Sequence, residues 1–249
     1  MPWANPFRKE IDEVLALTQP PPDVELPPGP EAIAVGLLMR ARILLRATAL
    51  LADRLLGGAT DPLVRSILEV CFTAGWLLAD PGGYEIYLGH YRKKWRQIAE
   101  AQTGKPAPLN PSIRAELAFF LDRSRTDMPP EANLGPFDQQ AKTGGFEDFY
   151  SLYAMASRRA HPDLNAAKLG LIEQPDLGVM RVNASPIAAE LADAYVKMST
   201  YLVARLGAVI AEHLNWENAS ELVAYVDRLR AEAEADFAAA KAKVESEEL

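Results

Sequence analysis

The sequence has few of the residues on which disulfide, metal and cofactor chemistry depends. It contains one cysteine, Cys71, and three histidines in 249 residues. A single cysteine excludes an intramolecular disulfide and is the usage expected in a reducing compartment. The histidines lack partners at ligand spacing, and neither H-E-x-x-H nor Glu-x-x-His occurs, so we expect no metal. G-x-G-x-x-G, a complete Walker loop and G-x-S-x-G are also missing, and no cofactor is predicted.

Positively charged residues are also fewer than negatively charged ones. Twenty-six Lys and Arg stand against 34 Asp and Glu, which gives a net charge of -8. A surface of that sign repels nucleic acid and anionic lipid, so such a partner would need a local basic patch. The first residues have no apolar signal core, and Arg or Glu interrupts the apolar runs before the roughly 18 residues that a membrane span needs. We therefore expect a cytoplasmic chain that does not span a membrane.

What the sequence has in abundance is helical periodicity. Apolar residues recur every three or four positions through most of the chain. We expect an all-α fold, a helical bundle of six to seven helices with a long C-terminal helix. Asp61 is expected to cap one helix and Pro62 to open it. The helical segments are expected at 6–17, 31–56, 61–80, 84–102, 112–124, 146–161, 186–213 and 217–246. The stretches 125–145 and 162–184 are expected to be loops, with a short extended piece at 178–184.

Composition suggests three parts. Residues 1–30 are expected to form an N-terminal helix and a linker, because six prolines lie between positions 20 and 30. Residues 31–216 are expected to form the bundle. Residues 217–249 form the long helix, which carries nine Asp/Glu against four Lys/Arg. This helix either packs antiparallel on the bundle or mediates dimerisation.

Two segments place polar side chains on faces that their apolar neighbours mark as buried. Tyr153, Ser157 and His161 recur every fourth position and span about 80° of one helix face. The segment 61–80 is apolar on almost every side, yet it contains Arg65 and Glu69, four residues apart. Burying these charges is expensive unless their hydrogen bonds are satisfied. We therefore expect the two helices to pack together and the five side chains to form one network.

Such a network has two interpretations. It can be a scaffold that fixes how the helices pack. It can also be a site in which Arg65, Arg158 or Arg159 holds an anion and His161 moves a proton near neutral pH. The five residues are therefore candidate catalytic residues, and the sequence leaves both interpretations open.

The same two stretches, R-S-I-L-E at 65–69 and Y-x-x-x-S-x-x-x-H-P at 153–162, resemble the signatures of a bacterial helical family catalogued as a domain of unknown function. The resemblance covers roughly residues 35–215. Proteins of this kind are similar in outline to the HEPN superfamily. The resemblance implies a helical bundle that often dimerises and an activity like that of the metal-independent ribonucleases of toxin and phage-defence systems.

In those nucleases an arginine, four to six further residues and a histidine form the active site. This sequence departs from the pattern, because Ala154, Met155 and Ala156 stand where the arginine would precede His161. Only a rebuilt site that combines Arg65 with His161 would fit.

A basic stretch, YRKKWRQ at 91–97, could supply the missing patch. Phosphate contacts together with a stacking ring would suit single-stranded RNA. The alternative is a solvated helix face with a half-buried tryptophan. The candidate RNA-binding residues are Arg92, Lys93, Lys94, Trp95 and Arg96.

Two functional classes follow. The first is an RNA- or nucleotide-directed effector of a defence or toxin type. The second is a non-catalytic interaction module in which the polar cluster is structural. In both cases we expect a homodimer.

Overall fold

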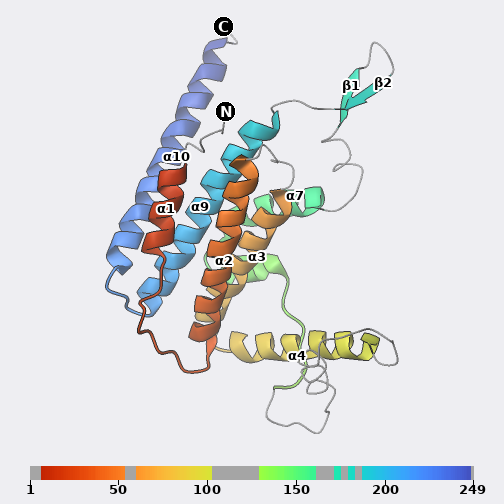
Figure 1. Ribbon diagram of the computed structural model, residues 1–249, viewed down its shortest axis with the longest axis vertical. Coiled ribbons are helices and arrows are strands. Elements are labelled where there is room, and N and C mark those ends of the chain that lie inside the picture. The colour runs from red at the N-terminus through yellow and green to blue at the C-terminus, as the bar shows by residue number, and fades with distance from the viewer. Residues whose placement is uncertain are drawn as a thin grey trace.

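The computed structural model describes residues 7–53, 60–102, 129–160, 171–174, 179–182 and 187–247. The fold is all-α, with one short hairpin added (Figure 1). The helices are α1 (Arg8–Leu17), α2 (Pro30–Asp53), α3 (Asp61–Ala79), α4 (Gly83–Gln102), α6 (Phe137–Thr143), η2 (Glu147–Phe149), α7 (Tyr150–Ala160), α9 (Ile187–His213) and α10 (Ala219–Glu247). The strands β1 (Leu171–Gln174) and β2 (Val179–Val182) pair antiparallel, with Leu171 opposite Val182.

Helix α3 is the centre of the bundle, as its apolar sequence predicts. It packs against α2, α9, α6 and α7, and it meets α4 at its C-terminal end. Among the described helices it is also the one long and apolar enough to span a membrane by length and composition. Twelve of its residues, including Phe72 and Trp76, are buried inside the bundle. Packing against other helices therefore accounts for its apolar composition.

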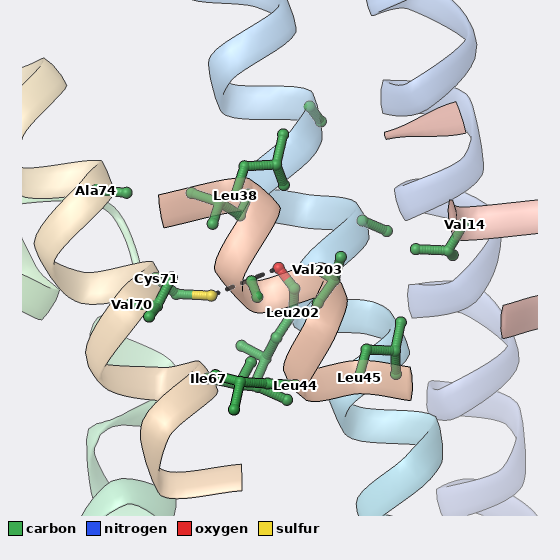
Figure 2. Close-up of a cluster of buried hydrophobic side chains, with 14 of the residues drawn as sticks. Val14, Leu38, Leu44, Leu45, Ile67, Val70, Cys71, Ala74, Leu202 and Val203 are labelled. Carbon is green, nitrogen blue, oxygen red and sulfur yellow. Dashed lines mark hydrogen bonds between the residues drawn. The ribbon is translucent and has the colours of Figure 1, made fainter. Parts of the chain in front are cut away.

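The core between α2, α3 and α9 is made of aliphatic side chains (Figure 2). In Figure 2, Leu44 of α2 lies beside Ile67 of α3, and Leu45 points away from α3. The Cys71 thiol donates a weak hydrogen bond to the carbonyl oxygen of Leu202 in α9, at 3.7 Å. Burial raises the pKa of this thiol far above its ordinary value. Cys71 is therefore an inert core residue.

The first and last helices belong to the same core. Ile11, Val14 and Leu15 of α1 and Leu222 and Val226 of α10 are all buried in it. Figure 1 shows α1 and α10 beside α9, with the end of α10 extending beyond its neighbours. The Pro-rich segment connects the end of α1 to the start of α2. Helix α1 packs against both α2 and α9.

Three local expectations were wrong. Asp61 does not cap α3: Thr60 holds the N-cap position, and Asp61 is the first helical residue, buried, with its carboxylate accepting a hydrogen bond from the Tyr195 hydroxyl. The expected loop at 125–145 contains α6. The expected loop at 162–184 contains β1 as well as the extended piece β2. The helix expected at 112–124 lies outside the described residues.

Candidate functional site

The sequence-predicted polar cluster forms where α7 packs against α3. The Nε of Arg65 donates to Oε1 of Glu69 at 3.0 Å. The hydroxyl of Tyr153 donates to the same oxygen at 3.4 Å. The Arg65 guanidinium carbon lies 6.0 Å from the centre of the Tyr153 ring. The expected pairing of the two helices is confirmed, and three of the five side chains are in contact.

Aromatic packing fixes the position of Tyr153. Its ring centre lies 5.8 Å from that of Phe72 in α3 and 5.2 Å from that of Phe137 in α6. Tyr150, one turn earlier in α7, contributes a third ring at 5.9 Å. Edge-on and tilted ring pairs of this kind add to the stability that burial alone provides. The phenol is therefore held in place by the core and presents its hydroxyl to Glu69.

The charged pair is less buried than the sequence predicts. The Arg65 side chain is 31% exposed and that of Glu69 is 30% exposed. An accessible pair four residues apart on a helix stabilises it by only about 0.3–0.5 kcal/mol. Among the described residues, the two terminal nitrogens of Arg65 have no hydrogen-bond partner. The pair therefore orients a guanidinium that keeps donors available to a ligand.

Ser157 lies one turn beyond Tyr153. Its Oγ is closed off from solvent and has no hydrogen-bond partner within the described part of the chain. The expected bond from Ser157 to the cluster is absent there, so that detail of the prediction was wrong. His161, the fifth member, lies outside the described residues.

Thr73, another polar residue of α3, belongs to a separate contact. Its hydroxyl bonds Oε1 of Gln140 in α6 at 3.2 Å, and the amide of Gln140 donates to the carbonyl of Gly135 at 2.8 Å. Both side chains are buried. This contact anchors α6 to α3 and takes no part in the cluster.

The basic stretch lies on α4, which projects away from the bundle in Figure 1. The chain after residue 128 runs along it. Arg92 donates to the carbonyl of Pro129 at 3.2 Å, and Lys93 donates to Oδ1 of Asn133 at 2.7 Å. Trp95 meets the ring of Tyr91 edge-on at 5.9 Å. Several of the expected RNA contacts are therefore already used within the protein.

The charge of Arg96 is balanced by two carboxylates, those of Glu100 and Glu131. Its guanidinium bonds Glu100 at 2.7 Å and pairs with both carboxylate oxygens of Glu131. These hydrogen bonds raise the pKa of Arg96 and lower the pKa of Glu131. Lys94 is exposed. The RNA-binding role of Arg92, Lys93, Lys94, Trp95 and Arg96 stays a prediction, with Lys94 the most accessible of the five.

His90 on the same helix is half-buried and accepts a hydrogen bond at Nδ1 from the Leu134 amide, at 3.4 Å. Burial first, and then Lys94 and Lys93, lower the pKa of this imidazole. The group is neutral at pH 7 and contributes no charge to the basic stretch.

The sequence reasoning missed one arginine. An arginine on a helix is ordinarily assigned to the surface, but Arg42 is 5% exposed and therefore buried. Leu38 and Leu45, at positions i−4 and i+3 from Arg42, are buried and mark its helix face as apolar, and that spacing was the available signal. Over the described residues, no group of His, Cys, Asp and Glu has a geometry that could hold a metal ion.

Similarity to known proteins concerns residues 31–177. No curated protein and no solved structure shows significant similarity to the chain. Residues 31–177 match the family of unknown function DUF5677, a span that begins in α2 and includes α3, α4, α6 and α7. The match contains Arg65, Glu69, Tyr153 and Ser157 and ends before α9. Because it covers more than half of the chain, the protein belongs to the DUF5677 family.

Proposed function

We propose that the protein is an RNA- or nucleotide-directed effector of the defence or toxin type, with Arg65, Glu69, Tyr153, Ser157 and His161 as its working residues. The observation that supports it most is the state of Arg65. This guanidinium is held by Glu69 through Nε, is partly exposed, and has terminal donors that no described residue uses. An arginine held in this way is suited to bidentate binding of a phosphate.

The other members have supporting roles in this proposal. Glu69 fixes the orientation of Arg65, and the hydroxyl of Tyr153 fixes Glu69. Ser157, one turn further along α7, has a buried hydroxyl for which no described residue is a hydrogen-bond partner. His161 would transfer the proton, because an imidazole is the side chain that titrates nearest to neutral pH.

The reaction that fits these groups is a metal-independent RNA cleavage. The ribose 2′-oxygen attacks the adjacent phosphorus, and a bond forms between them. The bond from phosphorus to the 5′-oxygen breaks, which leaves a 2′,3′-cyclic phosphate and a free 5′-hydroxyl. His161 accepts the proton of the attacking hydroxyl or donates one to the leaving oxygen, and water takes up or supplies the other proton. Arg65 stabilises the charge on the phosphoryl oxygens.

The test uses paired variants. His161→Asn and Arg65→Gln should each lower the rate of cleavage of a single-stranded RNA by about 100-fold or more, because each removes a group that acts in the transition state. The controls are His213→Asn, a half-exposed histidine of α9, and Arg40→Gln, an exposed arginine of α2. Both controls should cleave at the rate of the unchanged protein. The proposal fails if the unchanged protein does not cleave or bind RNA, or if His161→Asn cleaves normally.

A second candidate function rests on a different surface. A groove of about 1120 Å³ lies between α1, η2, α9 and α10, and Phe149, Met198 and Tyr201 are among its apolar lining. Five acidic and three basic side chains also line it: Glu10, Asp148, Glu232, Glu234 and Asp236, with Lys197, Arg205 and Arg230. An apolar surface bordered by charges is typical of a protein interface. On this alternative the protein is an interaction module, and the cluster at α3 and α7 is structural.

A further inference from the structure

A second pocket lies between α1 and α2, and it shares no residue with the α3–α7 cluster. Its volume is about 640 Å³. This lies within the range of pockets that bind small molecules. Ile11, Leu15 and Leu50 provide apolar lining, and Gln19 lines it as well.

Arg42 is the unusual member of this pocket. Its side chain is buried, yet within the described part of the chain it bonds only neutral acceptors, Oγ1 of Thr18 at 3.2 Å and Oε1 of Gln19 at 2.5 Å. No described carboxylate lies within ion-pair distance of it. Burial, and then the nearby charge of Arg46, lower its pKa. A buried guanidinium without a counter-ion is expensive, so its retention calls for an anion.

The other charged residues that line the pocket form no ion pair with any residue that the structure describes. Arg8 and Arg46 are exposed, and neither has an ion-pair partner among the described residues. The same holds for Asp12 and Asp53. Oδ1 of Asp53 is moreover buried and has no hydrogen-bond partner in the described ranges of the chain. Three guanidinium groups against two carboxylates make the pocket positive, in a chain whose net charge is -8.

We propose that this pocket binds a small phosphate monoester that carries hydroxyl groups, such as a sugar phosphate. The phosphate lies against Arg42 and Arg46, where guanidinium groups can bind two of its oxygens at once. A ligand hydroxyl donates to the carboxylate of Asp53, which lines the pocket. The amide nitrogen of Gln19 stays free to donate, because Gln19 accepts from Arg42 through Oε1. Apolar side chains cover the remainder of the ligand.

The alternative is that Arg42 only ties the C-terminal end of α1 to α2. The two explanations differ in what happens when the charge is removed. Arg42→Met keeps the length and the apolar stem of the side chain. On the structural alternative, this change affects folding alone, and the unchanged protein binds no phosphate ester.

The experiment is a calorimetric titration of the full chain with ribose 5-phosphate, with inorganic phosphate and succinate as further probes at matched ionic strength. Arg42→Met and Arg46→Met should each weaken binding of ribose 5-phosphate by roughly tenfold or more, since each removes a charge-assisted hydrogen bond. The matched control is Arg40→Met, because Arg40 is exposed on the same helix and does not line the pocket. It should bind like the unchanged protein.

Three results would overturn the proposal. The first is the absence of ribose 5-phosphate binding by the unchanged chain. The second is unaltered binding by the Arg46→Met variant, which decides the matter even if Arg42→Met does not fold, because Arg46 is exposed. The third is succinate binding as tight as that of ribose 5-phosphate, which would contradict the assignment of a phosphate monoester. None of these results depends on RNA cleavage.

Discussion

Tyr225 joins the last helix to the first. Its hydroxyl donates to the carbonyl of Glu10 in α1 at 3.3 Å, and its ring is buried. The guanidinium carbon of Arg228 lies 4.5 Å from the ring centre, and Arg228 also pairs with Glu13 at 3.1 Å. Burial, followed by the nearby charge of Glu13, raises the pKa of Tyr225 to about 12. The contact between α1 and α10 therefore depends on a neutral phenol.

This raised pKa predicts a loss of stability at high pH. An unfolded tyrosine ionises near pH 10, so the unfolded state releases the proton first. The contribution of Tyr225 is fully present below about pH 10 and is lost as the pH rises through about 12. Between these values, Tyr225→Phe should lose less free energy of unfolding than the unchanged protein. Urea unfolding at several pH values measures this, with the exposed Tyr150→Phe as the control. Parallel losses in all three proteins would contradict the assignment.

Single residues differ in how well the sequence predicts them. Tyr153 is predicted to face α3 because its spacing agrees with that of Phe146, Phe149 and Ala156, and it does contact Phe72 and Glu69. Arg42 occupies an equally apolar face, but an arginine is ordinarily assigned to the surface. Its burial depends on Thr18 and Gln19, which lie 24 and 23 residues away in the chain. The helical periodicity of α2 does not reveal which hydrogen-bond acceptors another segment of the chain will bring to Arg42.

Helix α3 and the end of α6 approach each other backbone to backbone. A Cβ added at Gly75 would lie 2.7 Å from the carbonyl oxygen of Gly144 and 3.0 Å from the ring of Phe146. At Gly144 an added Cβ would lie 2.7 Å from the backbone nitrogen of Trp76. The absence of side chains at Gly75 and Gly144 allows α6 to pack directly against α3. This contact also positions the segment that connects α6 to α7.

Two glycine substitutions should therefore act in opposite directions. Gly75→Ala should destabilise the fold by about 1–3 kcal/mol, since backbone atoms of α6 occupy the space of the methyl group. Gly36→Ala, in exposed mid-helix sequence with nothing within 4 Å of the added Cβ, should stabilise by about 0.5–1 kcal/mol. Urea unfolding of both variants provides the measurement. Equal effects of the two changes would contradict the close packing of α3 on α6.

Long elements are predicted better than short ones. The helices α2, α3, α4 and α9 lie within a few residues of their expected bounds, because each contains several turns of apolar repeat. Helix α6 has seven residues, and a stretch of that length shows barely two turns of any period. Strand β1 has four residues and is defined by its pairing with β2, which a local pattern does not reveal.

At the scale of the whole molecule, the long acidic helix and the groove beside it suggest where a second copy would bind. The groove contains acidic and basic side chains together, which suits self-association of one surface. On α10, Ala233 is exposed and lines the groove, whereas Ala231 is exposed and does not. The two positions therefore form a matched pair for testing a dimer.

We expect the protein to be a homodimer in solution, with a mass twice the 27.3 kDa of one chain. Ala233→Asp should shift it to the mass of a monomer, because the change buries an unpaired carboxylate in the interface. Ala231→Asp should leave the dimer intact. Light scattering coupled to size-exclusion chromatography measures all three masses. A monomeric unchanged protein, or equal behaviour of the two variants, would contradict this interface.

The all-α class and the pairing of α3 with α7 could be predicted from the sequence, since both follow from which faces are apolar. The partial exposure of Arg65 and Glu69 could not, because it depends on how far α7 extends over α3. The proposed activity depends on this exposure. A closed pair would serve packing alone, whereas the observed pair leaves donors of Arg65 available for a phosphate.

The most direct measurement compares a single-stranded RNA with the same sequence containing 2′-deoxyribose throughout, in a chelating buffer. The mechanism requires the 2′-hydroxyl as the attacking group. We therefore expect cleavage of the RNA to products that end in a 2′,3′-cyclic phosphate, no cleavage of the deoxy strand, and loss of activity in His161→Asn. An intact RNA, or equal cleavage of both strands, would contradict the account.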